Sequence, residues 1–112
     1  MSLDLVLRNA RLVDGTGAPW FRGAVAVREG TIAAIRRDGA SDLVDEATEV
    51  LDLGGQVLCP GFIDTHSHSD LRLFSEPTLE PKIRQGITTE VLGQDGFSMA
   101  PMYPDDGPIV WE

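Results

Sequence analysis

The chain is poor in several residue types, and each scarcity excludes a class of protein. Its one cysteine, Cys59, cannot form an internal disulfide, and the apolar neighbours Val57 and Leu58 favour a buried packing thiol. Only 9 basic residues face 18 acidic ones, and the net charge of −9 would repel phosphate backbones, so we expect no nucleic-acid partner. Long apolar runs and a secretory signal pattern are also missing, which predicts a cytoplasmic protein without a membrane role.

Histidine is scarce too, and both histidines stand together in the segment GFIDTHSHSD, residues 61–70. Side chains i and i+2 of a β-strand point to the same face, so a strand entering this segment would aim Asp64, His66 and His68 together. Two neutral imidazoles suit zinc and similar ions, and a catalytic site would add a third protein ligand and an open position for water. The alternative is a pair of polar residues at a strand end.

The first half of the chain alternates apolar and polar residues in short segments, which predicts β-strands at residues 3–8, 24–28, 31–35 and 49–53. Turn residues separate them at 14–17, 29–30 and 54–55, and Glu29-Gly30 has the length of a two-residue hairpin loop. The spacing of Gly15 and Gly17 is too short for a phosphate-binding loop, so we interpret it as a turn. These strands predict part of a small β-sandwich over residues 1–58.

The second half, residues 59–112, has a different pattern. A proline start, apolar residues one turn apart and a closing glycine predict a short helix over residues 77–85, and the β-rich run 87–92 predicts a strand. A strand, helix and strand in this order form a crossover that would bring Asp95 to the same end as His66 and His68. Asp95-Gly96 is equally a common turn dipeptide. Residues 103–108 predict an exposed loop in which Asp105 and Asp106 are solvated.

Three segments resemble one family. LCPGFIDTHSHSD, residues 58–70, resembles the signature of the amidohydrolase superfamily, whose metal-dependent hydrolases carry His-X-His after the first strand of a (β/α)₈ barrel. Residues 14–35 and 77–101 resemble the N-acyl-D-amino-acid deacylase (D-aminoacylase) branch. The resemblance implies an α+β fragment, mostly β: part of a small β-sandwich plus the first strand-helix-strand unit of an incomplete (β/α)₈ TIM barrel. Cyclic amidases such as dihydroorotases and hydantoinases share this plan, but dihydroorotases carry an arginine where Asp70 stands.

The resemblance also implies the chemistry. His66 and His68 would hold zinc or another divalent metal, and Asp95 would replace the cysteine that ligates metal in related D-aminoacylases. Because Asp64 lies on the same strand face as the histidines, it would orient one imidazole by accepting its hydrogen bond, or else cap the strand end. The metal would polarise the amide carbonyl of an N-acyl-D-amino acid and activate water, while the general base is expected outside this portion.

Length limits what this chain can do alone. A complete barrel needs about 250 residues, so a chain of 112 residues is expected to be an inactive amino-terminal portion of a longer hydrolase. Its partner would be the remainder of the barrel or a homo-oligomer, and metal would be weakly bound or absent. The alternative is a non-catalytic remnant or an assembly subunit that acts only through an interface.

Overall fold

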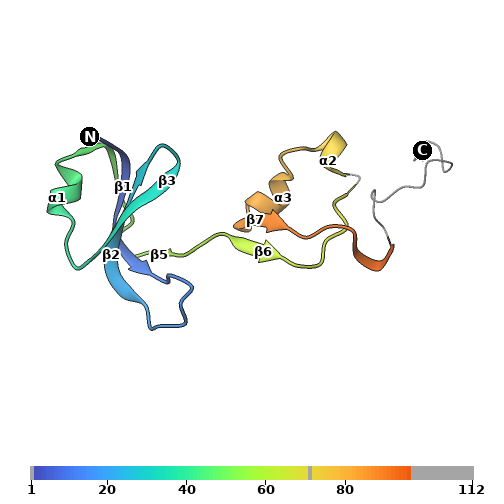
Figure 1. Ribbon diagram of the computed structural model, residues 1–112, viewed down its shortest axis with the longest axis horizontal. Coiled ribbons are helices and arrows are strands. Elements are labelled where there is room, and N and C mark those ends of the chain that lie inside the picture. Colours follow the sequence, from blue (N-terminus) through green and yellow to red (C-terminus); the bar gives the residue numbers. More distant parts are fainter. Residues whose placement is uncertain (1, 71, 97–112) are drawn as a thin grey trace. The chain divides into compact units, whose positions relative to one another are not determined.

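The computed structural model describes residues 2–70 and 72–96 of the chain (Figure 1). It divides into two compact units, Met1–Pro60 and Gly61–Glu112, a division two residues beyond the predicted boundary. The predicted loop with Asp105 and Asp106 lies outside the described residues. None of the helices in the described ranges is long and apolar enough to cross a membrane.

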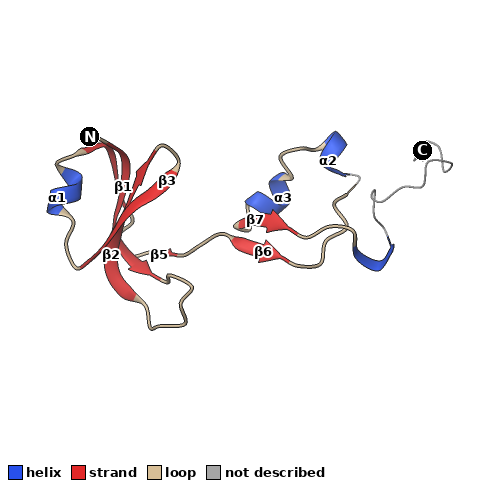
Figure 2. Cartoon of the chain, viewed as in Figure 1, coloured by secondary structure: helices blue, strands red, loops and turns tan. Residues whose placement is uncertain are grey.

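The first unit is built on one mixed β-sheet (Figure 2). Its strand order is β3-β2-β1-β4, and β5 pairs with the far half of β1. β1 is antiparallel to β2 but parallel to β4 and β5. The four predicted strands are confirmed, and most are longer than expected; the strands are β1 (Leu3–Leu12), β2 (Phe21–Arg28), β3 (Thr31–Arg37), β4 (Ala47–Asp52) and β5 (Val57–Leu58).

The hairpin between β2 and β3 is confirmed as a two-residue loop. Arg28 pairs with Thr31, and the loop residues Glu29 and Gly30 both have positive φ angles, 50° and 71°. Positive φ at both loop positions defines a type I′ turn, whose twist matches that of the flanking strands. The pairing of β2 with β3 is therefore set locally.

Two small groups of buried side chains form the core of this unit. Leu3, Val6, Ala24 and Ala26 pack with Leu43 of the short helix α1 (Ser41–Val44), which the sequence did not predict. A second group has Ala10, Leu12 and Val25 at its centre. The described residues of the first unit thus form one sheet with helix α1 against it, and the second sheet of the expected sandwich remains a prediction.

Cys59 differs from its prediction. The thiol is exposed, although it was expected to be buried. Cys59 follows the two-residue strand β5 and belongs to neither buried group, so its apolar neighbours do not enclose it. The expectation failed because β5 lies at the margin of the sheet, where an apolar run does not ensure burial.

The second unit contains one strand-helix-strand crossover. Strands β6 (Phe62–Asp64) and β7 (Ile87–Glu90) pair in parallel, and α2 (Arg72–Ser75) and α3 (Glu80–Ile83) lie between them in the chain. α3 is shorter than the predicted helix over 77–85, because Leu79 has a φ of 42° that a helix interior does not allow. The parallel pairing agrees with the predicted crossover, and its continuation into a barrel remains a prediction.

Candidate metal centre

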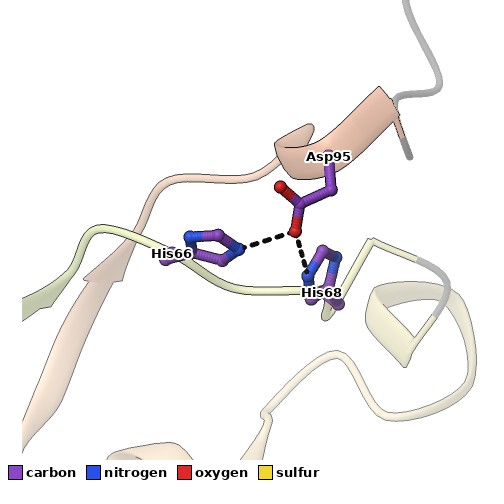
Figure 3. A group of neighbouring side chains, drawn as sticks. All are labelled: His66, His68 and Asp95. Carbon is purple, nitrogen blue, oxygen red and sulfur yellow. Dashed lines mark hydrogen bonds and ion pairs between the residues drawn. The ribbon is translucent and has the colours of Figure 1, made fainter.

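The candidate metal centre lies within the second unit, after the ends of its two parallel strands. The loop after β6 carries His66 and His68, and the short 3₁₀ segment Gln94–Gly96 after β7 carries Asp95. Because the carboxyl ends of adjacent parallel strands meet at one edge of a sheet, the three side chains converge from two segments of the chain (Figure 3). The predicted proximity of these residues is therefore present in the structure.

One carboxylate oxygen bridges the two imidazoles. Asp95 Oδ2 lies 3.0 Å from His66 Nε2 and 3.3 Å from His68 Nε2, as the dashed lines in Figure 3 indicate. The ring centroids are 5.3 Å apart with the ring planes at 69°. One ligand atom from each residue lies within 4.8 Å of those of the other two, and all three side chains are exposed. The group is therefore compact and open to solvent in the described part of the chain.

These distances fit a divalent ion such as zinc. Two atoms bound tetrahedrally at about 2.0–2.1 Å from zinc are about 3.3 Å apart, close to the two separations between nitrogen and oxygen observed here. Two imidazole nitrogens and one carboxylate oxygen are also the donor types of several catalytic zinc sites, which keep a further position for water or substrate. The side chains present thus suit such an ion, and ligation itself stays a prediction.

The backbone at Asp95 explains how its carboxylate reaches the histidines. Asp95 has φ 55° and ψ 26°, in the left-handed region, and Gly93 and Gly96 beside it also have positive φ. Aspartate tolerates this region better than most residues with a side chain. Asp95 therefore forms the turn that the sequence suggested, and the same turn points the carboxylate at the imidazoles.

Asp64 makes two contacts that the structure describes, and its predicted role toward an imidazole stays a prediction. Its Oδ1 accepts a hydrogen bond from the backbone N–H of His66 at 3.2 Å, and its Oδ2 accepts one from Lys82 Nζ at 2.6 Å. The bond from Lys82, followed by that from His66 N–H, holds the pKa of Asp64 below its usual value. Asp64 thus holds the His66 backbone.

Lys82 was not singled out by the sequence analysis, yet it lies at the centre of this arrangement. Besides Asp64, its ammonium group contacts Glu90 Oε1 at 3.0 Å and Ser67 Oγ at 3.4 Å. Hydrogen bonds to Asp64 and then to Glu90 raise the pKa of Lys82. Burial works to raise the pKa of Glu90, but bonds from Lys82 and from Ser69 and Ser67 lower it overall. The sequence did contain a signal for this role of Lys82: the lysine stands between two predicted strands, and each strand contains an acidic residue near its end.

Asp70 also connects the two loops. This side chain is buried, and its Oδ1 accepts the backbone N–H of Gly93 at 3.1 Å, two residues before Asp95. A carboxylate in this position binds the protein's own backbone, whereas the arginine of dihydroorotases at the matching position would present a cation. The contact fastens the loop after β6 to the segment that carries Asp95.

Comparison with known proteins places these features in a family. The model of the amidohydrolase family matches residues 49–112, which include both histidines and Asp95. An N-acyl-D-glutamate deacylase from Alcaligenes xylosoxydans xylosoxydans is 46% identical over 99 residues, covering 88% of this chain and 20% of that protein. The chain therefore spans about a fifth of the length of this curated relative.

Two solved structures are also similar. The N-acyl-D-glutamate deacylase of Bordetella bronchiseptica, in complex with zinc and a phosphonate mimic of the tetrahedral intermediate, is 43% identical with a TM-score of 0.72, over 83% of this chain and 19% of that one. A crystal structure of D-aminoacylase is 39% identical with a TM-score of 0.79, over 96% of this chain and 22% of that one. The mostly-β fold with its mixed sheet therefore corresponds to part of the fold of these deacylases.

Proposed function

The chain belongs to the amidohydrolase family, and on that premise we propose that it supplies metal ligands to a hydrolase that cleaves the amide bond of N-acyl-D-amino acids. The observation that carries this proposal is the convergence of His66, His68 and Asp95 on one small volume. The similarity to deacylases of N-acyl-D-glutamate and to D-aminoacylase supports the substrate class. The zinc in the Bordetella enzyme supports zinc as the ion.

The residues of this chain would have distinct roles. His66 and His68 would bind a divalent ion through Nε2, and Asp95 would bind it through Oδ2. When bound, such an ion polarises an amide carbonyl and acidifies a water molecule. Asp64 would keep the His66 backbone in place, and the exposure of the three ligands would leave one side of the centre open to substrate.

The remaining parts of the enzyme lie outside these 112 residues in this proposal. A general base and further ligands would come from the rest of a (β/α)₈ barrel that β6, α3 and β7 begin, with the sheet of the first unit contributing to a separate sandwich domain. The described residues alone offer three ligands in this group. We therefore propose that the intact protein is active in the cytoplasm and that this portion by itself is not.

The test is to change the histidines in the full-length protein that carries this chain. The double variant His66→Ala, His68→Ala should lose zinc at one site and lower kcat/KM for an N-acyl-D-amino acid by orders of magnitude, because the ion contributes directly to the chemistry. Metal content is measured by atomic absorption after dialysis, and turnover by release of the free D-amino acid.

Glu49→Gln is the matched control, since Glu49 is an exposed residue of β4 in the first unit. It should retain both zinc and activity. Stoichiometric zinc and unchanged turnover in the double histidine variant would contradict the proposed function. If the double histidine variant loses zinc but the wild type hydrolyses no N-acyl-D-amino acid, the metal centre stands and the proposed substrate class is wrong.

A further inference from the structure

A three-way contact of Lys82 connects the ends of both strands that precede the metal centre. Lys82 belongs to α3, Asp64 is the last residue of β6, and Glu90 is the last residue of β7. Asp64 and Glu90 are direct partners in the parallel pairing, so their carboxylates lie beside each other. The Lys82 ammonium group donates hydrogen bonds to Asp64 and Ser67, and it forms an ion pair with Glu90.

We propose that Lys82 is a positioning residue for the candidate metal centre. By binding Asp64 and Glu90 at once, it fixes the spacing of the two strand ends and of the loops that carry His66, His68 and Asp95. This inference rests on the proposed function, because it assigns Lys82 a role toward the metal that those residues would bind.

The chain of contacts from Lys82 to the metal ligands is short on both sides. On the first side, Lys82 holds Asp64, whose other oxygen accepts the N–H of His66. On the second side, Lys82 holds Glu90, from which only four residues lead to Asp95. Residues that orient metal ligands in this way are commonly required for tight binding.

The environment of Lys82 sets it apart from the other ion pairs of this unit. The side chain of Lys82 is 29% exposed and that of Glu90 is 10% exposed, so water screens this contact poorly. Arg84, two residues after Lys82, pairs with Glu80 four residues earlier, and its side chain is 75% exposed. Exposed pairs of that kind contribute little. Without Lys82, two adjacent carboxylates would repel each other at the strand ends.

The experiment compares Lys82→Met with Arg84→Met in the full-length protein that carries this chain. Met keeps much of the length of each side chain and removes its charge. The zinc dissociation constant is measured by competition with a chelator, and hydrogen exchange of the peptide 61–70 is followed by mass spectrometry in the metal-free protein. Lys82→Met should weaken zinc binding about 10-fold, at the low end of the range for residues that orient ligands. It should also speed exchange in the peptide, whereas Arg84→Met should change neither.

Two further variants separate positioning from folding and from charge balance. Lys82→Arg keeps a cation that can reach both carboxylates, and it should recover part of the zinc affinity. The double variant Lys82→Met, Glu90→Gln removes one charge of each sign, so it should fold as the wild type does. It should still bind zinc weakly, because Asp64 has lost its hydrogen bond from Lys82. Wild-type zinc affinity in this double variant would overturn the inference, since Lys82 would then only neutralise Glu90.

The outcomes also distinguish this inference from the proposed function. Unchanged zinc affinity and unchanged exchange in Lys82→Met would overturn the role of Lys82 and leave the metal centre intact. A wild-type protein whose zinc does not depend on His66 and His68 would overturn both. A wild type that binds zinc through the histidines but hydrolyses no N-acyl-D-amino acid would overturn the substrate and leave the role of Lys82 standing.

Discussion

At the scale of single residues, Asp95 combines two properties that are usually separate. Its left-handed backbone makes the turn, and its carboxylate reaches both imidazoles. A residue present only for the turn could be replaced by asparagine, which also tolerates the left-handed region. A residue that binds metal could not, because a neutral amide oxygen is a weaker ligand than a carboxylate. Substitution by asparagine therefore distinguishes a turn residue, which it would replace without loss, from a metal ligand, which it would not replace.

We expect both Asp95→Asn and Asp95→Ala in the full-length protein to weaken zinc binding at least 10-fold, a typical scale for perturbing a metal centre. Asp95→Ala should also lower the thermal midpoint, because alanine does not favour a positive φ, while Asp95→Asn should not. Chelator competition and calorimetry measure the two effects. Tight zinc binding in Asp95→Asn would assign Asp95 to the turn alone.

At the scale of the elements, Asp52 shows how the first sheet joins its strands. Asp52 ends β4, and its carboxylate accepts bonds from Gly54 N–H at 2.9 Å and from the side chains of Asn9 and Arg8 in β1 at 3.0 and 3.1 Å. Asn9 has a φ of 55° at the point where the pairing of β1 with β2 shifts register. The Gly54 bond, then the Asn9 bond, lower the pKa of Asp52. One carboxylate thus fastens β4 to the irregular part of β1.

The pH dependence of stability should follow from this carboxylate. Because its folded pKa lies below the ordinary value of 3.8, its contribution is present above that value and is lost as the pH falls through the folded pKa. Asp52→Asn should therefore flatten the fall of stability below about pH 4, with Asn9→Ala giving a smaller change in the same range. Urea unfolding of the 112-residue chain at several pH values measures this. An unaltered acid profile in Asp52→Asn would contradict the assignment.

At the scale of the whole molecule, each unit leaves large apolar side chains in water. Ile32 and Ile35 of β3 are exposed in the first unit, and Phe62, Ile63 and Phe74 are exposed in the second. The sheet of β6 and β7 has only two strands, and such a sheet is marginally stable alone. Exposed apolar surface and open strand edges both favour association with another chain or with more of the same protein.

We therefore expect the isolated 112-residue chain to self-associate, which light scattering would show as species above 12.1 kDa. Ile63→Lys should reduce the association, because it replaces an exposed apolar side chain with a charged one. Thr89→Lys is the control. Thr89 is the β7 partner of Ile63, and its replacement by lysine adds the same charge without removing apolar surface. A monodisperse monomer at micromolar concentration would contradict this expectation.

The strands of the first unit could be predicted because their signal is local. Alternation of apolar and polar residues and the turn residues Glu29-Gly30 depend on near neighbours, and these strands and their hairpin are present in the structure. Helices α1 and α2, the start of α3 and the exposure of Cys59 were missed. A four-residue helix has too few residues to show a period, and the left-handed Leu79 gives no sequence signal.

For the candidate site, the sequence by itself determined the ligand types and their spacing: two histidines one residue apart and an aspartate after the next strand. The sequence could determine this because the donor atoms depend only on which residues are present. Only the tertiary structure decided that Asp95 Oδ2 lies between the two imidazoles and that Asp64 accepts the backbone N–H of His66. It also decided that Lys82 joins two strand ends, because contacts across 18 and 8 positions depend on how β6, α3 and β7 pack.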